Sequence, residues 1–415
     1  MKRSLIFPLF ALFLGPTAQA LDERQADLWQ QDILAYQRQL KQQHIDLFHN
    51  IEEEAFDDAV EDIIDQLDEL NRDQVLTQLM QLTHRIGDGH TSIPLWNQSL
   101  HYFPFAVRIF EGKAYITQTS ADHSQLLGHQ IISINDVPVA EVLAQLKTTA
   151  PFIENSQSAD IRAAQYLPRF EVLHGLGILN SQDQVAFQFH DGRFQYPYRL
   201  SAQTEVDLDQ SLSFRQNQRF EKSVVANDNF WLGSHNQGET AYLYFRRYIS
   251  SNEMFEFAGK ALAYLQEHRS RQLIIDLREN YGGDFFAGLI LAQQLVLADG
   301  IDWRHGVYVL TDAGTFSAAM SNAAQFSQIL NAKRVGQATG AKPSGYQDMG
   351  QFTLPHSELI VTYSKRFYRF SDTMPSALFP DVGIETKLEH YLQQQDPVLA
   401  WVFNDIQQQA SSNNE

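Results

Sequence analysis

The sequence contains no cysteine among its 415 residues. This absence excludes disulfide bonds, thiolate metal sites and a cysteine nucleophile, and it excludes lipid attachment through a cysteine after the leader. The fold therefore has to be stabilised by its hydrophobic core.

Basic residues are scarce, with 31 Lys and Arg against 50 Asp and Glu and a formal net charge of −19. Such a chain is a poor candidate for binding nucleic acid or an anionic membrane surface, and we interpret its charge as a means of staying in solution. No phosphate-loop or dinucleotide-binding glycine pattern occurs. The 14 histidines are scattered, and His44 and His49 do not share a helix face. We therefore expect no metal and no cofactor.

Only the first twenty residues, MKRSLIFPLFALFLGPTAQA, depart from the pattern of a globular chain. Two basic residues precede an apolar run, and an A-x-A motif follows it. The run is too short to span a bilayer, so residues 1–20 are predicted to be a secretory signal peptide cleaved near Ala20. An uncleaved N-terminal anchor is the alternative. Cleavage would place the protein in the periplasm or the extracellular medium.

The length exceeds that of a usual single core and predicts more than one domain. In residues 21–95, apolar side chains recur at three- and four-residue steps, which predicts a helical module with an acidic outer face. The helices are expected over residues 27–43, 51–70 and 74–85. Asn71 or Asp73 can cap the last of them.

Residues 96–200 change to short alternating strands, expected at 106–110, 114–119 and 130–134. An Asn-Asp turn and the start of a helix follow the third strand. This pattern resembles a PDZ domain, in which an open sheet edge accepts an extended peptide as an additional strand. A plain β-module is the alternative.

Residues 201–236 are polar and acidic and are predicted to form a connector. From residue 237 to 415, strands alternate with helices, which predicts a parallel sheet with right-handed crossovers. Strands are expected at 241–248, 272–277 and 307–310, and helices at 252–267, 285–297 and 316–330.

Ser317 follows the last of these strands at a strand-to-helix turn. Such a turn exposes a serine hydroxyl and directs the next backbone N–H towards the group that the serine attacks, as nucleophilic hydrolases require. The alternative is that Ser317 caps the first turn of the helix. Upstream, Gly282 and Gly283 end another buried strand, and free backbone N–H groups at such a turn can bind an oxyanion. His90 lies in a tight Gly-Asp-Gly-His turn, which holds a possible general base at a strand entrance.

The motifs L-I-I-D-L-R-x-N-x-G-G, L-T-D-x-x-T-x-S-A-A and V-G-x-x-T-x-x-K occur in this order between residues 273 and 342. In this the chain resembles the C-terminal-processing (tail-specific) peptidases and the related tricorn-type serine peptidases. The helical module that ends in G-D-G-H-T, and the closing segments F-P-D-V and D-P-V-L, resemble the tricorn-like branch. The resemblance implies an α+β multidomain fold with an N-terminal helical module, a PDZ-like β-module and a crotonase/ClpP-like α/β catalytic domain.

The resemblance also implies roles for single residues. Ser317 matches the nucleophile, and Gly282 or Gly283 together with the N–H of Ala318 match the oxyanion donors. Two patterns for the base coexist, because His90 matches the histidine of the tricorn-like branch and Lys342 matches the lysine of the processing peptidases. No glutamate stands at the position of the family's acid. The nearest carboxylate there belongs to Asp372, and Asp348 is its rival.

Together these features predict an exported serine endopeptidase that acts on protein or peptide substrates through an acyl-enzyme on Ser317. A non-catalytic protein of the same fold that binds peptides or apolar small molecules is the alternative. A hydrolase of small esters is another.

Overall fold

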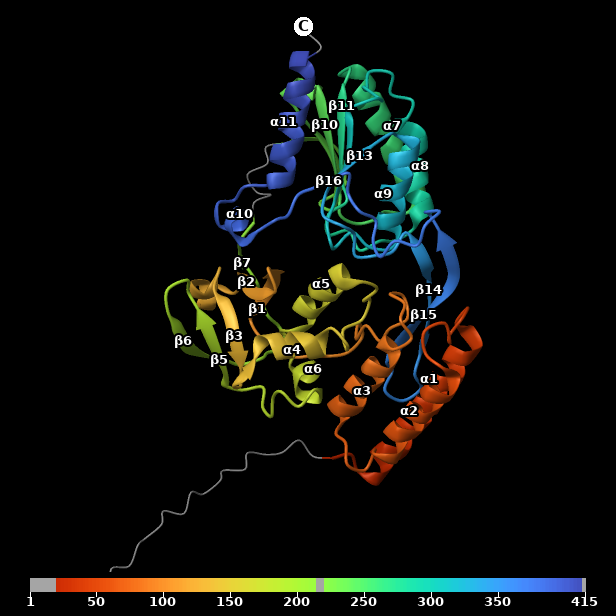
Figure 1. Ribbon diagram of the computed structural model, residues 1–415, viewed down its shortest axis with the longest axis vertical. Helices are drawn as coiled ribbons and strands as arrows, with labels where there is room; N and C mark the ends of the chain where they lie inside the picture. Colours follow the sequence, from red (N-terminus) through yellow and green to blue (C-terminus); the bar gives the residue numbers. More distant parts are fainter. Residues whose placement is uncertain (1–19, 214–219, 413–415) are drawn as a thin grey trace, which may run out of the picture.

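The computed structural model describes residues 20–213 and 220–412 (Figure 1). The predicted signal peptide lies outside the described residues except for Ala20. Within the described ranges, no helix has the length and apolar character needed to cross a membrane.

The chain begins with three helices, as the periodicity predicts. They are α1 (Glu23–Gln43), α2 (Glu53–Asp65) and α3 (Arg72–His84). Asp22 caps α1, and Asn71 caps α3 by accepting the N–H groups of Asp73 and Gln74. Each cap is part of a capping box, which satisfies backbone donors that a helix start would otherwise leave unpaired.

An antiparallel sheet follows, with the strand order β1-β2-β3-β5-β6; β4 pairs with β3, and β7 pairs with β2. The predicted Asn-Asp turn is present, since Asn135 and Asp136 have φ values of 49° and 66°. β1 lies at one edge of the sheet and carries α5 against it. The elements of this region are β1 (Phe105–Phe110), β2 (Lys113–Thr119), η1 (Ala121–Leu126), β3 (Gln130–Ile134), β4 (Val137–Pro138), α4 (Val139–Leu146), α5 (Ser156–Tyr166), α6 (Phe170–Gly175), β5 (Val185–His190), β6 (Gln195–Leu200) and β7 (Gln210–Ser211).

The second large sheet has the order β16-β13-β12-β11-β10-β9-β8. Neighbours from β10 to β16 pair in parallel, whereas β9 pairs antiparallel with both β10 and β8. The elements are β8 (Glu221–Asn227), β9 (Phe230–His235), η3 (Asn236–Gly238), β10 (Thr240–Phe245), α7 (Ser251–Glu267), β11 (Gln272–Asp276), α8 (Phe285–Leu295), β12 (Val307–Thr311), α9 (Ala318–Ile329), β13 (Lys333–Gly336), β14 (Ser344–Thr353), β15 (Ile360–Arg369), β16 (Val382–Gly383), α10 (Leu388–Leu392) and α11 (Pro397–Ser412).

The second sheet begins earlier in the chain than its sequence suggests. β8 and β9 lie within residues 201–236, which the polar composition predicts to be a connector. Most side chains of β8 are exposed, because β8 is the edge strand and has a neighbour on one side only. A polar edge strand of this kind has the composition of a linker.

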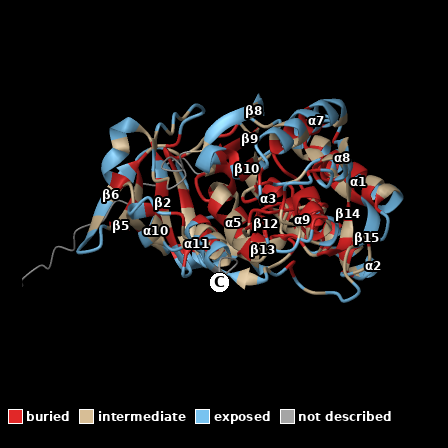
Figure 2. Ribbon diagram, turned by 90° about the horizontal axis from the view of Figure 1, so that it is seen from above, coloured by how far each residue is buried: buried red, intermediate tan, exposed pale blue. Residues whose placement is uncertain are grey.

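Helices cover the second sheet on both faces. α7, α8 and α9 pack on one face and α11 on the other, and Figure 1 shows them on opposite sides of the strands. Figure 2 shows buried residues concentrated in β10, β12 and α9, with exposed residues on β8 and α7. Ile274 and Tyr308 are fully buried beneath α11. Burial on this scale stabilises the fold by about 1.5–3 kcal/mol for each large side chain. The fold is therefore α+β, with N-terminal helices, an antiparallel sheet and a mixed α/β sheet, as predicted.

A long hairpin connects the second sheet to the N-terminal helices. β14 and β15 pair antiparallel and reach from the second sheet down to α1 and α3 (Figure 1). Leu354, Leu359 and Val361 belong to the same hydrophobic cluster as the first three helices. Ser92 forms an isolated β-bridge with Thr362. The hairpin thereby holds the segment that contains His90 against the second half of the chain.

Candidate active site

Ser317 lies between β12 and α9 in an unusual backbone conformation, with φ 51° and ψ −124°. Its side chain makes no capping hydrogen bond, so the simple N-cap interpretation is wrong. A non-glycine residue in such a conformation costs about 1–3 kcal/mol, and the surrounding structure has to maintain it. The conformation directs the hydroxyl away from the helix, which is the arrangement of a serine on a nucleophile turn.

The turn before Ser317 is fixed to the end of β11. The N–H of Phe316 donates to the carbonyl of Asn280 at 3.0 Å, and the hydroxyl of Thr315 donates to the carbonyl of Leu277 at 3.0 Å. Asp312 Oδ1 accepts the N–H of Glu279 at 2.8 Å. These bonds join the carboxyl ends of two neighbouring parallel strands and maintain the strained serine.

His90 is held by a carboxylate two residues before it. Asp88 Oδ1 accepts the N–H groups of His90 and Thr91, both at 2.9 Å, and the hydroxyl of Ser364 at 2.6 Å. Its other oxygen lies 2.9 Å from His44 Nε2 at the end of α1. Burial acts to raise the pKa of Asp88, but the hydrogen bonds from His44 and Ser364 outweigh it and lower the pKa to about 2. The ionised carboxylate thus joins α1, the His90 turn and β15.

The turn that holds Ser317 and the turn that holds His90 meet at these two side chains. His90 Nε2 lies 2.8 Å from Ser317 Oγ, although the residues are 227 positions apart in the sequence. The imidazole also stacks on Phe316, with ring centroids 5.3 Å apart. A nitrogen at this distance can remove the hydroxyl proton when the ring is neutral.

The environment keeps the His90 ring neutral. The side chain is 3% exposed, and burial lowers the pKa of His90 below its usual value. Asp88, the carbonyl of Tyr346 and Asp348 act in the opposite direction, while the guanidinium of Arg162 lowers the pKa further. His90 Nδ1 is buried and forms no hydrogen bond of normal geometry with the described residues, although the carbonyl of Tyr346 is near enough to raise the pKa of the ring.

Gly282 and Gly283 lie next to the serine. Gly282 has φ +101°, and a Cβ there would stand 2.7 Å from Ser317 Cβ and 3.0 Å from the Ala318 nitrogen. Only glycine, which has no Cβ, allows the backbone at position 282 to come this close to Ser317. The N–H of Gly282 donates to Asn280 Oδ1 at 3.0 Å. Among the hydrogen bonds of the described residues, none uses the N–H groups of Gly283 or Ala318, which leaves these two donors free for an oxyanion.

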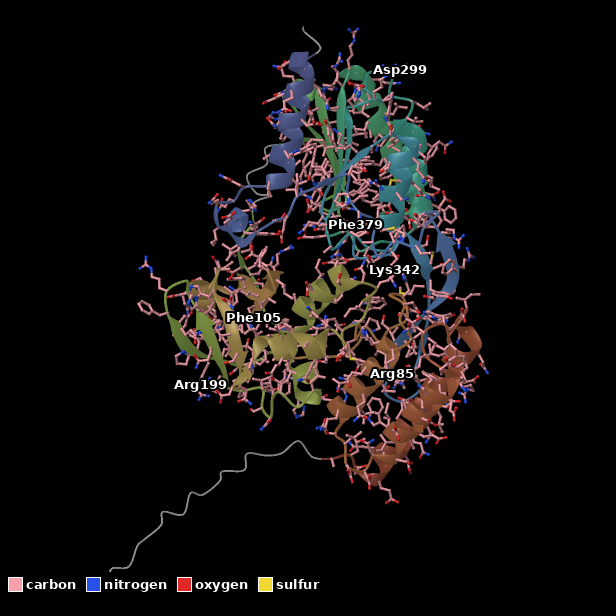
Figure 3. All side chains as sticks on the ribbon, viewed as in Figure 1. Arg85, Phe105, Arg199, Asp299, Lys342 and Phe379 are labelled. Atoms are coloured by element: carbon pink, nitrogen blue, oxygen red, sulfur yellow. The ribbon has the colours of Figure 1, made fainter. Side chains whose placement is uncertain are left out.

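Lys342 lies just before β14, where the two halves of the chain meet (Figure 3). It is partly buried, and its ammonium and backbone N–H both lower the pKa of Glu154. Within the described part of the chain, the Ser317 hydroxyl shares a hydrogen bond with His90 Nε2, and no hydrogen bond joins it to Lys342 Nζ. In the structure, Lys342 therefore interacts electrostatically with Glu154.

The two carboxylates suggested as acids lie elsewhere. Asp372 is exposed, in the bend after β15, and makes no hydrogen bond or ion pair to another described residue. Asp348 forms ion pairs with Lys365 at 3.2 Å and Arg366 at 3.1 Å. Among the hydrogen bonds of the described residues, neither carboxylate accepts one from His90.

The sequence did not point to two further residues of the site, Glu154 and Arg162. Glu154 is buried between the His90 turn and the start of β14, and Arg162 on α5 stacks against Phe316 at 5.3 Å and Tyr281 at 4.5 Å. Glu154 directly precedes Asn155, the cap of α5, and follows an apolar Pro-Phe-Ile run. A carboxylate after such a run is the only local signal, and it is weak.

His44, His49 and Asp88 form the one group of potential metal ligands found among the described residues, with ligand atoms within 4.8 Å of one another. His44 Nδ1 accepts the N–H of Asp46, so the ring proton is on Nε2, where it is donated to Asp88. A metal on Nε2 would require this proton to move to a nitrogen that already faces an N–H donor. The three residues fit a hydrogen-bonded support better than a metal site.

A cavity of about 670 Å³ lies between the antiparallel sheet and the second sheet. The edge strand β1 and α5 line one side, and Tyr281, Asp312 and Ala313 line the other. Glu279 forms ion pairs with Arg108 and Arg246 at its wall. Tyr281 precedes Gly282, so the cavity adjoins the Gly-Gly turn beside Ser317.

Comparisons with known proteins support the fold. No family model and no curated protein matches the chain. Among solved structures, mature CPAF complexed with lactacystin is similar, with a TM-score of 0.63 and 11% identity over 94% of this chain and 99% of that one. Mature CPAF is similar with a TM-score of 0.62 and 12% identity over 91% of this chain and 96% of that one. The chain therefore has the same fold as mature CPAF.

Proposed function

We propose that this protein is a serine peptidase that hydrolyses peptide bonds through an acyl-enzyme on Ser317, with His90 as the general base. The observation that carries the proposal is the 2.8 Å contact between His90 Nε2 and the hydroxyl of a conformationally strained serine. A protein that only binds peptides or apolar molecules needs neither the strain nor the contact.

The chemistry follows from the atoms present. Ser317 Oγ attacks the substrate carbonyl carbon while its proton passes to His90 Nε2. The carbonyl oxygen becomes an oxyanion, which the N–H groups of Gly283 and Ala318 stabilise. His90 then gives the proton to the leaving amine, and the C–N bond breaks. Water attacks the acyl-enzyme by the same route, and Ser317 is restored.

The cavity supports a peptide as the substrate. The free edge of β1 borders it, and an extended chain can pair with such an edge through backbone hydrogen bonds. Alternate side chains of this peptide would then face α5 and Tyr281. A peptide bound in this way reaches the Gly-Gly turn next to Ser317.

The reaction tests the proposal directly. A fluorophosphonate probe should label the wild-type protein on Ser317, and Ser317→Ala should abolish both labelling and hydrolysis of an unstructured protein substrate. Lactacystin, which is bound in the CPAF structure, is a second probe. Absence of labelling and of hydrolysis in folded wild-type protein would contradict the proposal. Hydrolysis of small esters but not of peptides would favour an esterase.

The N-terminal sequence supports the proposal that this peptidase acts outside the cytoplasm. A leader cleaved near Ala20 would deliver it to the periplasm or the medium, where the absence of cysteine avoids unwanted disulfides. Mass measurement of the N-terminus of protein recovered from the producing cells tests the cleavage. An intact N-terminus on the exported protein would indicate an anchor.

A further inference from the structure

The base of the proposed reaction lacks a visible partner on its second ring nitrogen. In a serine–histidine–carboxylate triad, a carboxylate faces Nδ1, selects the tautomer and stabilises the imidazolium that forms during attack. Here His90 Nδ1 is buried without a hydrogen bond of normal geometry among the described residues; the carbonyl of Tyr346 is near the ring, but neither Asp372 nor Asp348 forms a hydrogen bond with it. A buried polar atom without a partner is costly, so such an atom at a reaction centre points to a function.

Glu154 provides a second unpaired atom in the same region. Its side chain is 9% exposed, and its Oε2 is buried without a hydrogen-bond partner in the described structure. The residue precedes the cap of α5, yet its carboxylate does not cap the helix, because Asn155 does so. The backbone N–H of Glu154 donates to Ser158 Oγ at 2.9 Å, which fixes the start of the side chain.

Two glycines make room for this carboxylate. A Cβ on Gly89 would stand 2.9 Å from Glu154 Oε2 and 2.9 Å from Phe316 Cζ. A Cβ on Gly345 would stand 3.0 Å from Glu154 Oε1. Gly89 is bonded to His90, and the Phe316 ring stacks on the His90 ring. Glu154 and His90 therefore border the same glycine and the same aromatic ring.

We propose that Glu154 is the carboxylate partner of His90 and acts as a positioning residue for the base. This inference rests on the proposed peptidase function and adds the acid to it. The acid then comes from the segment before α5, on the N-terminal side of the nucleophile, and not from the segment after β15.

The charge balance of the step supports this role. When Ser317 attacks, its proton moves to His90 Nε2 and the ring becomes a cation. An ionised Glu154 stabilises that cation and keeps its own charge throughout, and the His90 ring becomes neutral again when it gives the proton to the leaving amine. The other charged groups around the pair are Asp88 in the same turn, Asp348 on β14, Arg162 on α5 and Lys342 before β14.

The ionisation of Glu154 gives the proposal a distinctive pH dependence. Burial raises the pKa of Glu154 to about 8, and the ammonium of Lys342 acts against this rise. The carboxyl group is then largely neutral at pH 7 and ionises as the pH increases through 8. Activity that needs an ionised Glu154 has its acidic limb near pH 8, whereas His90 alone would place that limb below 6.5.

The first experiment compares the wild type with Glu154→Gln, which keeps the size of the side chain and removes its ionisation. The rate of fluorophosphonate labelling of Ser317 and kcat/KM for a peptide are measured from pH 5 to 10. Loss of the partner should lower kcat/KM by roughly 10²-fold or more above pH 8, mainly through kcat, and move the acidic limb below pH 6.5. Thermal unfolding should stay close to that of the wild type, because the replaced group is largely neutral at pH 7.

Glu171→Gln is the matched control. Glu171 is also a buried glutamate paired with a histidine, since its Oε1 lies 2.7 Å from His101 Nδ1. This variant should alter stability without moving the pH profile of labelling. Unchanged rates and an unchanged profile in Glu154→Gln would overturn the proposal for Glu154 and leave the proposed peptidase function intact.

A second measurement does not depend on activity or on a variant that folds. In wild-type protein with ¹⁵N-labelled histidine, the His90 ring signals should show an inflection at about pH 8, caused by ionisation of the neighbouring Glu154. Absence of this inflection would refute the pairing. Its presence in a protein that neither labels nor hydrolyses would retain the pairing and refute the peptidase function.

Discussion

Ser317 and His90 are held in place by different kinds of structure. The serine depends on one sheet, because the hydrogen bonds of its turn connect the ends of β11 and β12, which are adjacent parallel strands. The histidine depends on Asp88, which receives hydrogen bonds from the end of α1 and from β15. The position of Ser317 is thus a property of one sheet, whereas the position of His90 depends on three segments packing together. Damage to that packing should affect catalysis before it affects the serine turn.

The largest expected effect concerns the base itself. His90→Ala should lower kcat/KM by roughly 10⁴-fold, because the serine then has no group to accept its proton. Lys342→Ala should lower it by less than about 10-fold, since the hydrogen bond of the Ser317 hydroxyl found among the described residues is with His90 and not with Lys342. The measurement is steady-state hydrolysis of a peptide at pH 9. Equal losses in the two variants, or a larger loss for Lys342→Ala, would transfer the role of base to the lysine.

The next prediction tests the stability of the serine side. Arg278 Nη2 lies 2.7 Å from Asp276 and 2.8 Å from Asp396, and all three side chains are buried. Asp396→Ala leaves a buried cation with half of its partners and should lower the free energy of unfolding by about 3–5 kcal/mol in urea titrations. Asp381→Ala breaks the exposed pair with Arg334 and should cost less than about 1 kcal/mol. Equal costs would show that the buried pair is not a support of the sheet.

A third prediction examines the space around the serine. Gly282→Ala places a methyl group against Ser317 Cβ and the Ala318 nitrogen, so kcat should fall by roughly 10²- to 10³-fold through loss of the oxyanion geometry. Gly259→Ala is the control, because a Cβ there meets nothing within 4 Å in the middle of α7. It should leave kcat unchanged and stabilise the helix by about 0.5–1 kcal/mol. Full activity of Gly282→Ala would exclude a tight approach at this turn.

The smallest effect is expected on the histidine side, where Asp88 connects the segments. Its pKa of about 2 lies below the usual value of an unfolded aspartate. The stabilisation is therefore complete above about pH 4 and is lost as the pH falls towards 2, and it amounts to about 2 kcal/mol. Asp88→Asn should remove this dependence, because an amide does not ionise between pH 2 and 7. Unfolding free energies measured between pH 2 and 7 test the prediction, and parallel curves for the two proteins would contradict it.

Much of the serine side could be predicted from the sequence. The apolar run of β12, the small residues of α9 and the Gly-Gly turn are local patterns, and neighbouring parallel strands place their carboxyl ends together. Ser317, Gly282, Gly283 and Ala318 therefore come together as the order of the motifs predicts. His90 was predicted from its turn and from the family resemblance. The catalytic roles of His90, Lys342 and Asp372 stay predictions.

Other parts could not be read from local patterns. β8 has the composition of a linker because it is an exposed edge strand. The β14–β15 hairpin also contacts the segment that follows α1, which is 300 positions away in the sequence: the hydroxyl of Tyr346 lies 2.6 Å from Asp46. Glu154 has no motif, because what distinguishes it is burial beside Gly89 and Gly345.

By itself, the sequence determined the elements and the Ser317 turn, since helices, parallel strands and glycine turns follow from contacts between residues that are close in the chain. Only the tertiary structure decided that His90 reaches Ser317 and that Glu154 is buried beside Gly89. Those outcomes depend on distances of a few ångströms between segments that are distant in the sequence, and on the exclusion of water that shifts the pKa values of His90 and Glu154. Burial is a property of the assembled fold, and no single segment contains it.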